Sequence, residues 1–216
     1  MKTHNLKIND RFRGFLPVIV DVETAGVEPG RNALLEMCVV LIHLDEKGSF
    51  VRGKTFFEHI LPFEGAILDP KSLEFNQIDP FQPLRFALDE KQALQNLFAP
   101  IQEALKKHRC QRAVLVGHNA WFDLLFIKEA VKRTQLSMPF HAFTCFDTAT
   151  LAGLFYGQTV LAKAVKAARI DFDTSEAHSA IYDAEKTADL FCAMLNTWHT
   201  MTTTYQNVLK GTGQPL

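Results

Sequence analysis

The sequence has 216 residues, enough for one domain of ordinary size, and 47% of them are hydrophobic. Lys and Arg number 23 against 24 Asp and Glu, which argues against the strongly basic surface of proteins that coat nucleic acids. No apolar run reaches the roughly 20 residues of a membrane helix, and the polar start suggests no signal peptide. The four scattered cysteines argue against structural zinc and disulfides, so we expect a cytoplasmic protein.

The predicted elements follow from apolar runs and turn residues along the chain. Strands are predicted at residues 16–22, 34–44, 50–61, 113–117 and 142–146. Helices are predicted at residues 73–78 and 90–107, from the fourth strand to about 133, at 149–155 and 160–169, and from 179 to about 198. Three strands followed by alternating helices and strands imply an α/β domain with a mixed sheet. We divide the chain into an N-terminal basic segment (1–15), the main domain (16–200) and a C-terminal tail (201–216).

Two carboxylates stand at the end of the first predicted strand, Asp21 and Glu23. Residues two apart on a strand point to the same side, so both side chains can serve one metal site. Ionised carboxylates beside a buried strand are unfavourable unless a cation compensates them. The alternative is a strand that simply ends in solvent, and a second Asp-x-Glu at Asp183 and Glu185 shows that the motif alone is weak.

Two further acidic positions begin predicted helices. Asp123 falls in the first turn after the fourth strand, where the helix dipole favours a carboxylate in any case. His178 precedes Asp183 by five residues, a spacing that does not share a helix face. We therefore expect His178 on the loop before the last helix and Asp183 one turn into it, although a lone histidine is more often structural.

Taken together, these motifs indicate metal-assisted phosphodiester chemistry. Four hard oxygen ligands without cysteine suit Mg²⁺ or Mn²⁺ rather than zinc. Four carboxylates can hold two ions that stabilise the attacking and leaving oxygens of a phosphodiester. A histidine, with an ordinary pKa near 6.5, can take a proton from water at neutral pH and act as general base.

Motifs along most of the chain resemble one enzyme family. They are residues 11–15 (RFRGF), 20–26 (VDVETAG), 75–80 (FNQIDP), 117–123 (GHNAWFD), 139–143 (PFHAF), 146–149 (FDTA), 157–160 (GQTV) and 177–180 (AHSA). The chain resembles the DEDDh 3′→5′ exonucleases, a superfamily that includes proofreading exonucleases, and within them the ribonuclease T family. The resemblance implies a ribonuclease H-like fold, a mixed β-sheet flanked by α-helices.

The resemblance also implies a mechanism and partners. Asp21, Glu23, Asp123 and Asp183 would hold two Mg²⁺ ions (Mn²⁺ being possible), and His178 would complete the metal site as the general base. The family is a homodimer that trims single-stranded 3′ ends of tRNA and other stable RNAs, releases nucleoside 5′-monophosphates and also acts on single-stranded DNA.

Substrate contacts are expected from aromatic and basic residues. By the resemblance, Phe75, Phe122 and Phe143 would stack on bases, which present a π-face whatever the sequence. Two local basic patches could bind phosphates, although solvated surface is the plain alternative for both. The patch residues that we select are Arg11, Arg13, Lys106 and Arg112.

Val27, Lys71 and the segment 136–139 depart from the family pattern, which leaves the preferred terminal base open. Two alternatives also stay open. A DNA-directed proofreading or repair exonuclease would differ in contacts to the 2′-OH, which a sequence does not display. An inactive RNA-binding module is disfavoured because all five catalytic side chains are present.

Overall fold

The computed structural model describes residues 7–176 and 179–212, with side chains to residue 205. Its sheet has five strands in the order β3-β2-β1-β4-β5. The strands are β1 (Phe15–Thr24), β2 (Leu34–Leu44), β3 (Phe50–His59), β4 (Arg112–Gly117) and β5 (Phe140–Asp147). The strands β1, β2 and β3 pair antiparallel, whereas β4 and β5 run parallel to β1. The predicted mixed sheet is confirmed.

The helices are α1 (Ile8–Arg11), α2 (Pro70–Asn76), α3 (Glu90–His108), α4 (Trp121–Thr134), α5 (Thr148–Tyr156), α6 (Leu161–Ala167) and α7 (Ala180–Thr212), with a short 3₁₀ helix at Pro83–Arg85. Aspartate side chains cap three of them, because a carboxylate can accept from the free amides of the first turn. Asp69 caps α2, Asp89 caps α3 and Asp147 caps α5.

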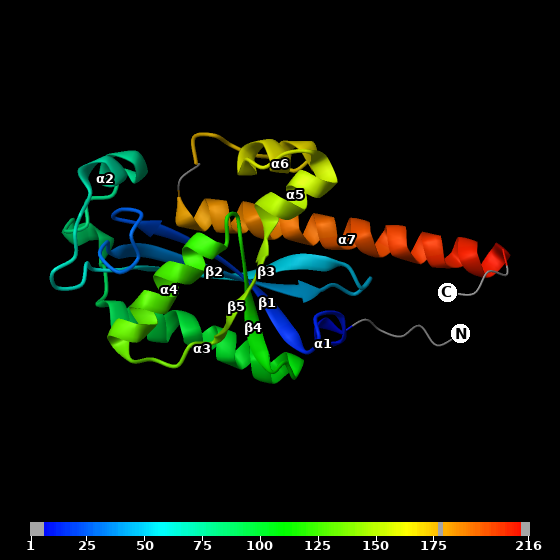
Figure 1. The fold of residues 1–216 in the computed structure, drawn as a ribbon, viewed down its shortest axis with the longest axis horizontal. Coiled ribbons are helices and arrows are strands. Elements are labelled where there is room, and N and C mark those ends of the chain that lie inside the picture. The colour runs from blue at the N-terminus through cyan, green and yellow to red at the C-terminus, as the bar shows by residue number, and fades with distance from the viewer. Residues whose placement is uncertain (1–6, 177–178, 213–216) are drawn as a thin grey trace.

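The helices cover the two faces of the sheet. The long α7 lies along one face, where α5 and α6 pack against it, and α3 and α4 cover the other face (Figure 1). The central strand β1 is hydrogen-bonded on both sides, and its residues Val18, Ile19 and Val20 have no exposed surface. A buried central strand gives rigid support to whatever its carboxyl end carries.

Some predicted boundaries were wrong. The first strand was predicted to end at residue 22 but continues to Thr24, so Glu23 as well as Asp21 lies within it. The last helix was predicted to end at about Trp198 but continues to Thr212, since no glycine or proline interrupts the chain before Gly211. The N-terminal segment contains α1, whose Ile8 is 2% exposed and belongs to the core. The division at residues 15 and 200 stays a prediction.

None of the helices within the described residues has the length and apolar character needed to cross a membrane.

Candidate active site

The site is built on the last residues of β1. Asp21 and Glu23 alternate with the buried Val20 and Val22, so both carboxylates project from one face of the sheet. The antiparallel register sets Cys38 opposite Asp21 and Glu36 opposite Glu23. Residues directly opposite in such a pair have their side chains close together on the same face. The face therefore carries a third carboxylate that the sequence did not single out.

Asp123 reaches the same place from the start of α4. It is 5% exposed, and its Oδ1 accepts a hydrogen bond of 3.1 Å from the backbone N–H of Val22, between the two β1 carboxylates. Gly117, at the end of β4, makes this approach possible. A Cβ on Gly117 would lie 3.1 Å from Asp123 Oδ2 and 3.1 Å from the Cα of Ala120. A larger residue there would push the aspartate and the helix start away from β1.

Asp183 occupies the first turn of α7, as predicted, and its N–H donates to the Ser179 carbonyl at 2.9 Å. The neighbouring Ala180 and Ala184 are completely buried, and their small side chains let α7 lie close to the sheet. The Asp183 charge acts on both Asp21 and Glu23. His178, the predicted general base, lies outside the described residues, so its expected position is not tested.

Burial and mutual repulsion disfavour the ionised forms of these acids. Burial, followed by the charges of Asp123, Glu23, Asp183 and Glu36, raises the pKa of Asp21 well above its ordinary range. Burial and then Glu36 raise the pKa of Glu23 to about 8. Burial also raises the pKa of Asp123 to about 8, against the lowering effect of backbone hydrogen bonds that include the one from Val22. Removing this repulsion requires either protons or cations.

The chemistry of the donor set fits a divalent cation. Carboxylate oxygens are hard ligands of the kind that Mg²⁺ and Mn²⁺ prefer. In residues 7–176 and 179–212, however, no group of three or more acidic, histidine or cysteine side chains is already gathered around one point.

A cavity of about 320 Å³ opens beside Glu23. Its walls include Val27, Lys71, Phe75 and Phe122. Phe75 is 67% exposed on α2, whereas Phe122 is partly buried and its ring centroid lies 4.9 Å from that of Phe126. Two of the three predicted stacking residues therefore adjoin the acidic site, together with two of the positions that depart from the family pattern.

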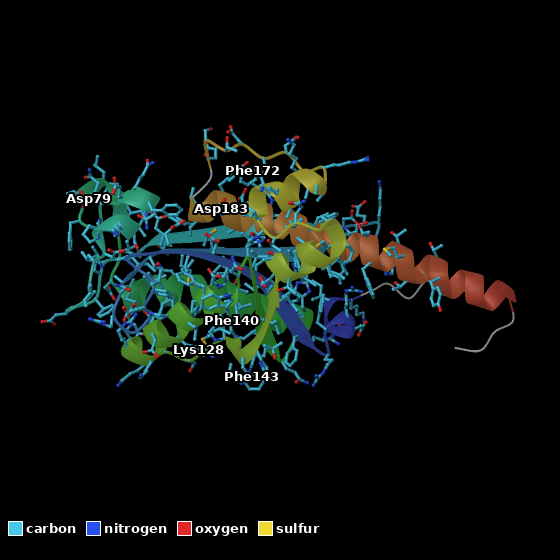
Figure 2. All side chains as sticks on the ribbon, turned by 45° about the horizontal axis from the view of Figure 1, so that its top comes forward. Asp79, Lys128, Phe140, Phe143, Phe172 and Asp183 are labelled. Atoms are coloured by element: carbon cyan, nitrogen blue, oxygen red, sulfur yellow. The ribbon has the colours of Figure 1, made fainter. Side chains whose placement is uncertain are left out.

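The third predicted stacking residue lies elsewhere. Phe143, which is 80% exposed, is not part of that cavity, and Figure 2 shows it on the side of the molecule opposite Asp183. Its ring lies 4.6 Å from that of His141, which lies 5.5 Å from Phe15 at the start of β1. The Arg13 guanidinium lies 5.9 Å from the Phe15 ring centroid.

We call the surface formed by Arg13, Phe15, His141 and Phe143, together with the nearby Arg11 two residues before Arg13, the basic band. It lies where β1 begins, whereas Asp21 and Glu23 lie towards the end of that strand. Two further predicted phosphate contacts share this end of the sheet. Arg112 pairs with Phe15 in the parallel register, and Lys106 stands in the last turn of α3, which leads into β4. The predicted substrate residues thus form two groups at opposite ends of β1.

Three residues of the site were missed from the sequence. Glu36 was visible only as a charge interrupting an apolar strand. Asn76 is buried at the end of α2, where its amide donates to the Thr24 carbonyl at 3.1 Å and bonds to Glu23. Asp147 accepts from the Asn119 N–H at 2.8 Å, which fixes the turn before α4. Nothing local in the sequence joins Asn76 or Asp147 to β1.

A strand-end set of acids on a mixed sheet of this order is the architecture of a nuclease class, and comparison with known proteins agrees. The family model described as exonuclease matches residues 18–191. The chain belongs to this exonuclease family. It is 56% identical over 192 residues to ribonuclease T of Marinobacter nauticus, covering 88% of this chain and 87% of that protein. It is 53% identical over 195 residues to ribonuclease T of Vibrio parahaemolyticus, covering 89% of this chain and 91% of that protein.

Solved structures support the fold. E. coli exonuclease I in complex with a dT13 oligonucleotide superposes with a TM-score of 0.64 at 15% identity over 88% of this chain. A full-length 3′-exonuclease superposes with a TM-score of 0.65 at 21% identity over 84% of this chain. The chain spans 43% of the exonuclease I chain and 61% of the 3′-exonuclease chain. At these identities the likeness concerns the fold alone, which is the predicted ribonuclease H-like fold.

Proposed function

We propose that this chain is a 3′→5′ exoribonuclease, which removes nucleoside 5′-monophosphates from single-stranded 3′ ends of tRNA and other stable RNAs. The observation that carries the proposal is the acid set of the half-buried Asp21 and Glu23 with the buried Asp123, beside a cavity walled by exposed or half-buried phenylalanines. The similarity to ribonuclease T over most of both chains supports RNA as the substrate.

Asp21, Glu23, Asp123 and Asp183 are the residues that would hold divalent cations, two Mg²⁺ ions in this proposal. Bound cations would supply an activated water and charge stabilisation at the phosphodiester. The chain's own residues supply orientation, because the hydrogen bond from Val22 fixes Asp123 relative to β1. His178 would accept the proton of the attacking water, a role for which only the neutral imidazole serves.

We propose that residues at both ends of β1 bind the substrate. Phe75 and Phe122 would stack on the terminal bases, and Val27 and Lys71 would bias which base is accepted because they line the same cavity. The basic band is too far along the sheet to share that cavity. We propose a homodimer in which the band of one subunit, with its Phe143, grips RNA that enters the partner's active site.

A DNA-directed exonuclease is the second candidate, because the architecture also superposes on exonuclease I, which was solved with a dT13 oligonucleotide. Matched RNA and DNA oligomers of one sequence decide between them by their relative rates.

The cytoplasmic location also stays a proposal, and it is compatible with four cysteines that are all free thiols.

The direct test uses a single-stranded RNA labelled at its 5′ end. The wild-type protein with Mg²⁺ should give a ladder that shortens one nucleotide at a time, and EDTA should stop it. Asp21→Asn should be inactive but folded. A second substrate, tRNA with or without its single-stranded 3′ end, tests the substrate class. Internal cleavage, or activity that survives in Asp21→Asn at high Mg²⁺, would contradict the proposal.

Complementation tests the proposed dimer. An Asp21→Asn subunit keeps its basic band, and an Arg11→Ala/Arg13→Ala subunit keeps its active site. If the band acts across the dimer, the mixed dimer contains one complete site and regains activity that neither parent shows. With subunit exchange verified, absence of recovery would mean that band and site act within one chain or that these arginines are ordinary surface.

A further inference from the structure

Glu36 is an acid beside the metal site that the proposed mechanism does not use. It lies on β2 directly opposite Glu23 of β1, on the same face of the sheet. The negative charge of Glu36 contributes to the raised pKa values of Asp21, Glu23 and Cys38. Only 12% of the Glu36 side chain is exposed. An acid so placed, if it turned freely, would compete with Glu23 for whatever cation binds there.

Two side chains hold Glu36. The Nδ1 of His59, its register partner on β3, lies 2.9 Å from Glu36 Oε1. The Nη2 of Arg85 donates to the same oxygen at 3.4 Å and also lies 3.4 Å from His59 Nδ1. The positive charge of Arg85 is therefore placed against Glu36.

Arg85 is itself fixed by the backbone. Its Nη2 donates to the Leu35 carbonyl at 2.9 Å, and its Nη1 donates to the Pro80 carbonyl at 3.3 Å. The side chain is 10% exposed, although its neighbours Leu84 and Phe86 in the same loop are 75% and 81% exposed. This arginine thus turns inward from an otherwise exposed apolar loop, where two backbone carbonyls hold its guanidinium against the mostly buried carboxylate of Glu36.

We propose that Arg85 is a positioning residue of the metal site, which acts by holding and offsetting the charge of Glu36. The inference rests on the proposed function, since it assumes that Glu23 and its three partner acids bind divalent cations. With Arg85 present, Glu36 stays against β3 and the loop, and the four ligands face the cation without a competitor. Partners behind metal ligands typically change metal affinity or activity by about 10- to 100-fold when they are replaced.

Three variants distinguish an effect of the Arg85 charge on the metal site from a purely structural role of Arg85 in its loop. Arg85→Met leaves Glu36 uncompensated, so Mg²⁺ should bind at least as tightly as in the wild type, while kcat falls about 10- to 100-fold because Glu36 turns towards the cation. Glu36→Gln leaves the arginine charge beside Glu23, so Mg²⁺ affinity should fall by about tenfold or more. The Arg85→Met/Glu36→Gln double variant restores the charge balance, so both quantities should return to within about threefold of the wild type, as expected for coupled neighbours.

The measurements are calorimetric titration with Mg²⁺ in the absence of RNA and the Mg²⁺ dependence of RNA hydrolysis. Arg133→Met is the matched control, because Arg133 also pairs with a buried acid, Glu90 at 2.6 Å, and with a carbonyl, that of Pro29 at 3.3 Å. The Arg133→Met variant should lower the melting temperature while leaving Mg²⁺ affinity unchanged.

The proposal is decided by how the two single variants change the Mg²⁺ affinity. It is overturned if Arg85→Met and Glu36→Gln both weaken Mg²⁺ binding, or if the double variant stays as impaired as Arg85→Met, because Arg85 would then act only as a loop anchor. If Arg85→Met does not fold, Glu36→Gln alone decides, and unchanged Mg²⁺ affinity in that variant refutes the inference. An inactive wild type that still binds Mg²⁺ with these charge effects would refute the proposed function and leave the role of Arg85 standing.

Discussion

Replacing Glu23 with Gln should change how the stability of the metal-free protein depends on pH. The pKa of Glu23 is raised to about 8 in the folded chain, whereas an unfolded glutamate titrates near 4.3. Between these values the folded state holds a proton that the unfolded state has lost. The contribution of the protonated Glu23 to folded-state stability is therefore fully present below about pH 4 and is lost progressively as the pH rises towards 8.

The magnitude follows from proton linkage. One such group lowers the free energy of unfolding by about 1.4 kcal/mol per pH unit well below its folded pKa, and by about 2.3 kcal/mol between pH 6 and pH 8. For a chain of this length that corresponds to about 5–10 °C in melting temperature. This is an upper limit, because water and relaxation of the site reduce the electrostatic penalty.

The assay is thermal unfolding in EDTA at pH 6 and pH 8, repeated with Mg²⁺. Wild type should melt lower at pH 8, and Mg²⁺ should restore the loss because it compensates the ionised acids. Glu23→Gln should show a smaller pH dependence and melt above wild type at pH 8 in EDTA. Glu64→Gln, at an exposed position, is the control and should behave as wild type. An identical pH dependence for Glu23→Gln and wild type would refute the reasoning.

Three further predictions concern turnover and binding. His178→Ala should lower kcat strongly with little loss of RNA affinity, and the wild-type rate should rise with pH as the imidazole loses its proton, which a pH–rate profile checks. Phe75→Ala should weaken single-strand binding by about 1–3 kcal/mol at unchanged melting temperature, whereas Phe122→Ala, which also loses packing in the core, should lower both. Arg11→Ala with Arg13→Ala should flatten the salt dependence of RNA binding by about one counterion per lost phosphate contact, as titrations at several salt concentrations would reveal.

Much of the fold could be predicted because its signals are local. The second strand was placed at residues 34–44, where it is found, since an apolar run ends at a turn whose Gly48 has a φ of +79°. The end of α7 was missed because the threonine-rich stretch after His199 loses the apolar periodicity although it stays helical. Residues 201–205 are mostly exposed, so this part of the helix has no apolar face from which the sequence could predict it.

The acids of the site were predictable for a related reason. Asp21 and Glu23 share a strand, and the face that they share follows from their spacing. The contributions of Glu36 and Arg85 depend on sheet register and on a loop that folds back, which the spacing of residues along the chain does not encode. A motif match grouped Phe143 with Phe75 and Phe122, but Phe143 does not line the cavity beside Glu23, and its contact with RNA stays a prediction.

The acidic site and the basic band lie at opposite ends of β1, so the length of this strand sets the distance between them within one subunit. From Phe15 to Glu23 the strand advances by about 26 Å, at about 3.3 Å per residue. A stacked single strand rises by about 3.4 Å per nucleotide, so about eight nucleotides would be needed to join a chain's own band to its own site. An exonuclease that must hold both points would slow abruptly as its substrate shortens past that length. If the band belongs to the other subunit, the cut-off length would instead report the spacing between subunits, and a series of shortened oligonucleotides would measure it directly.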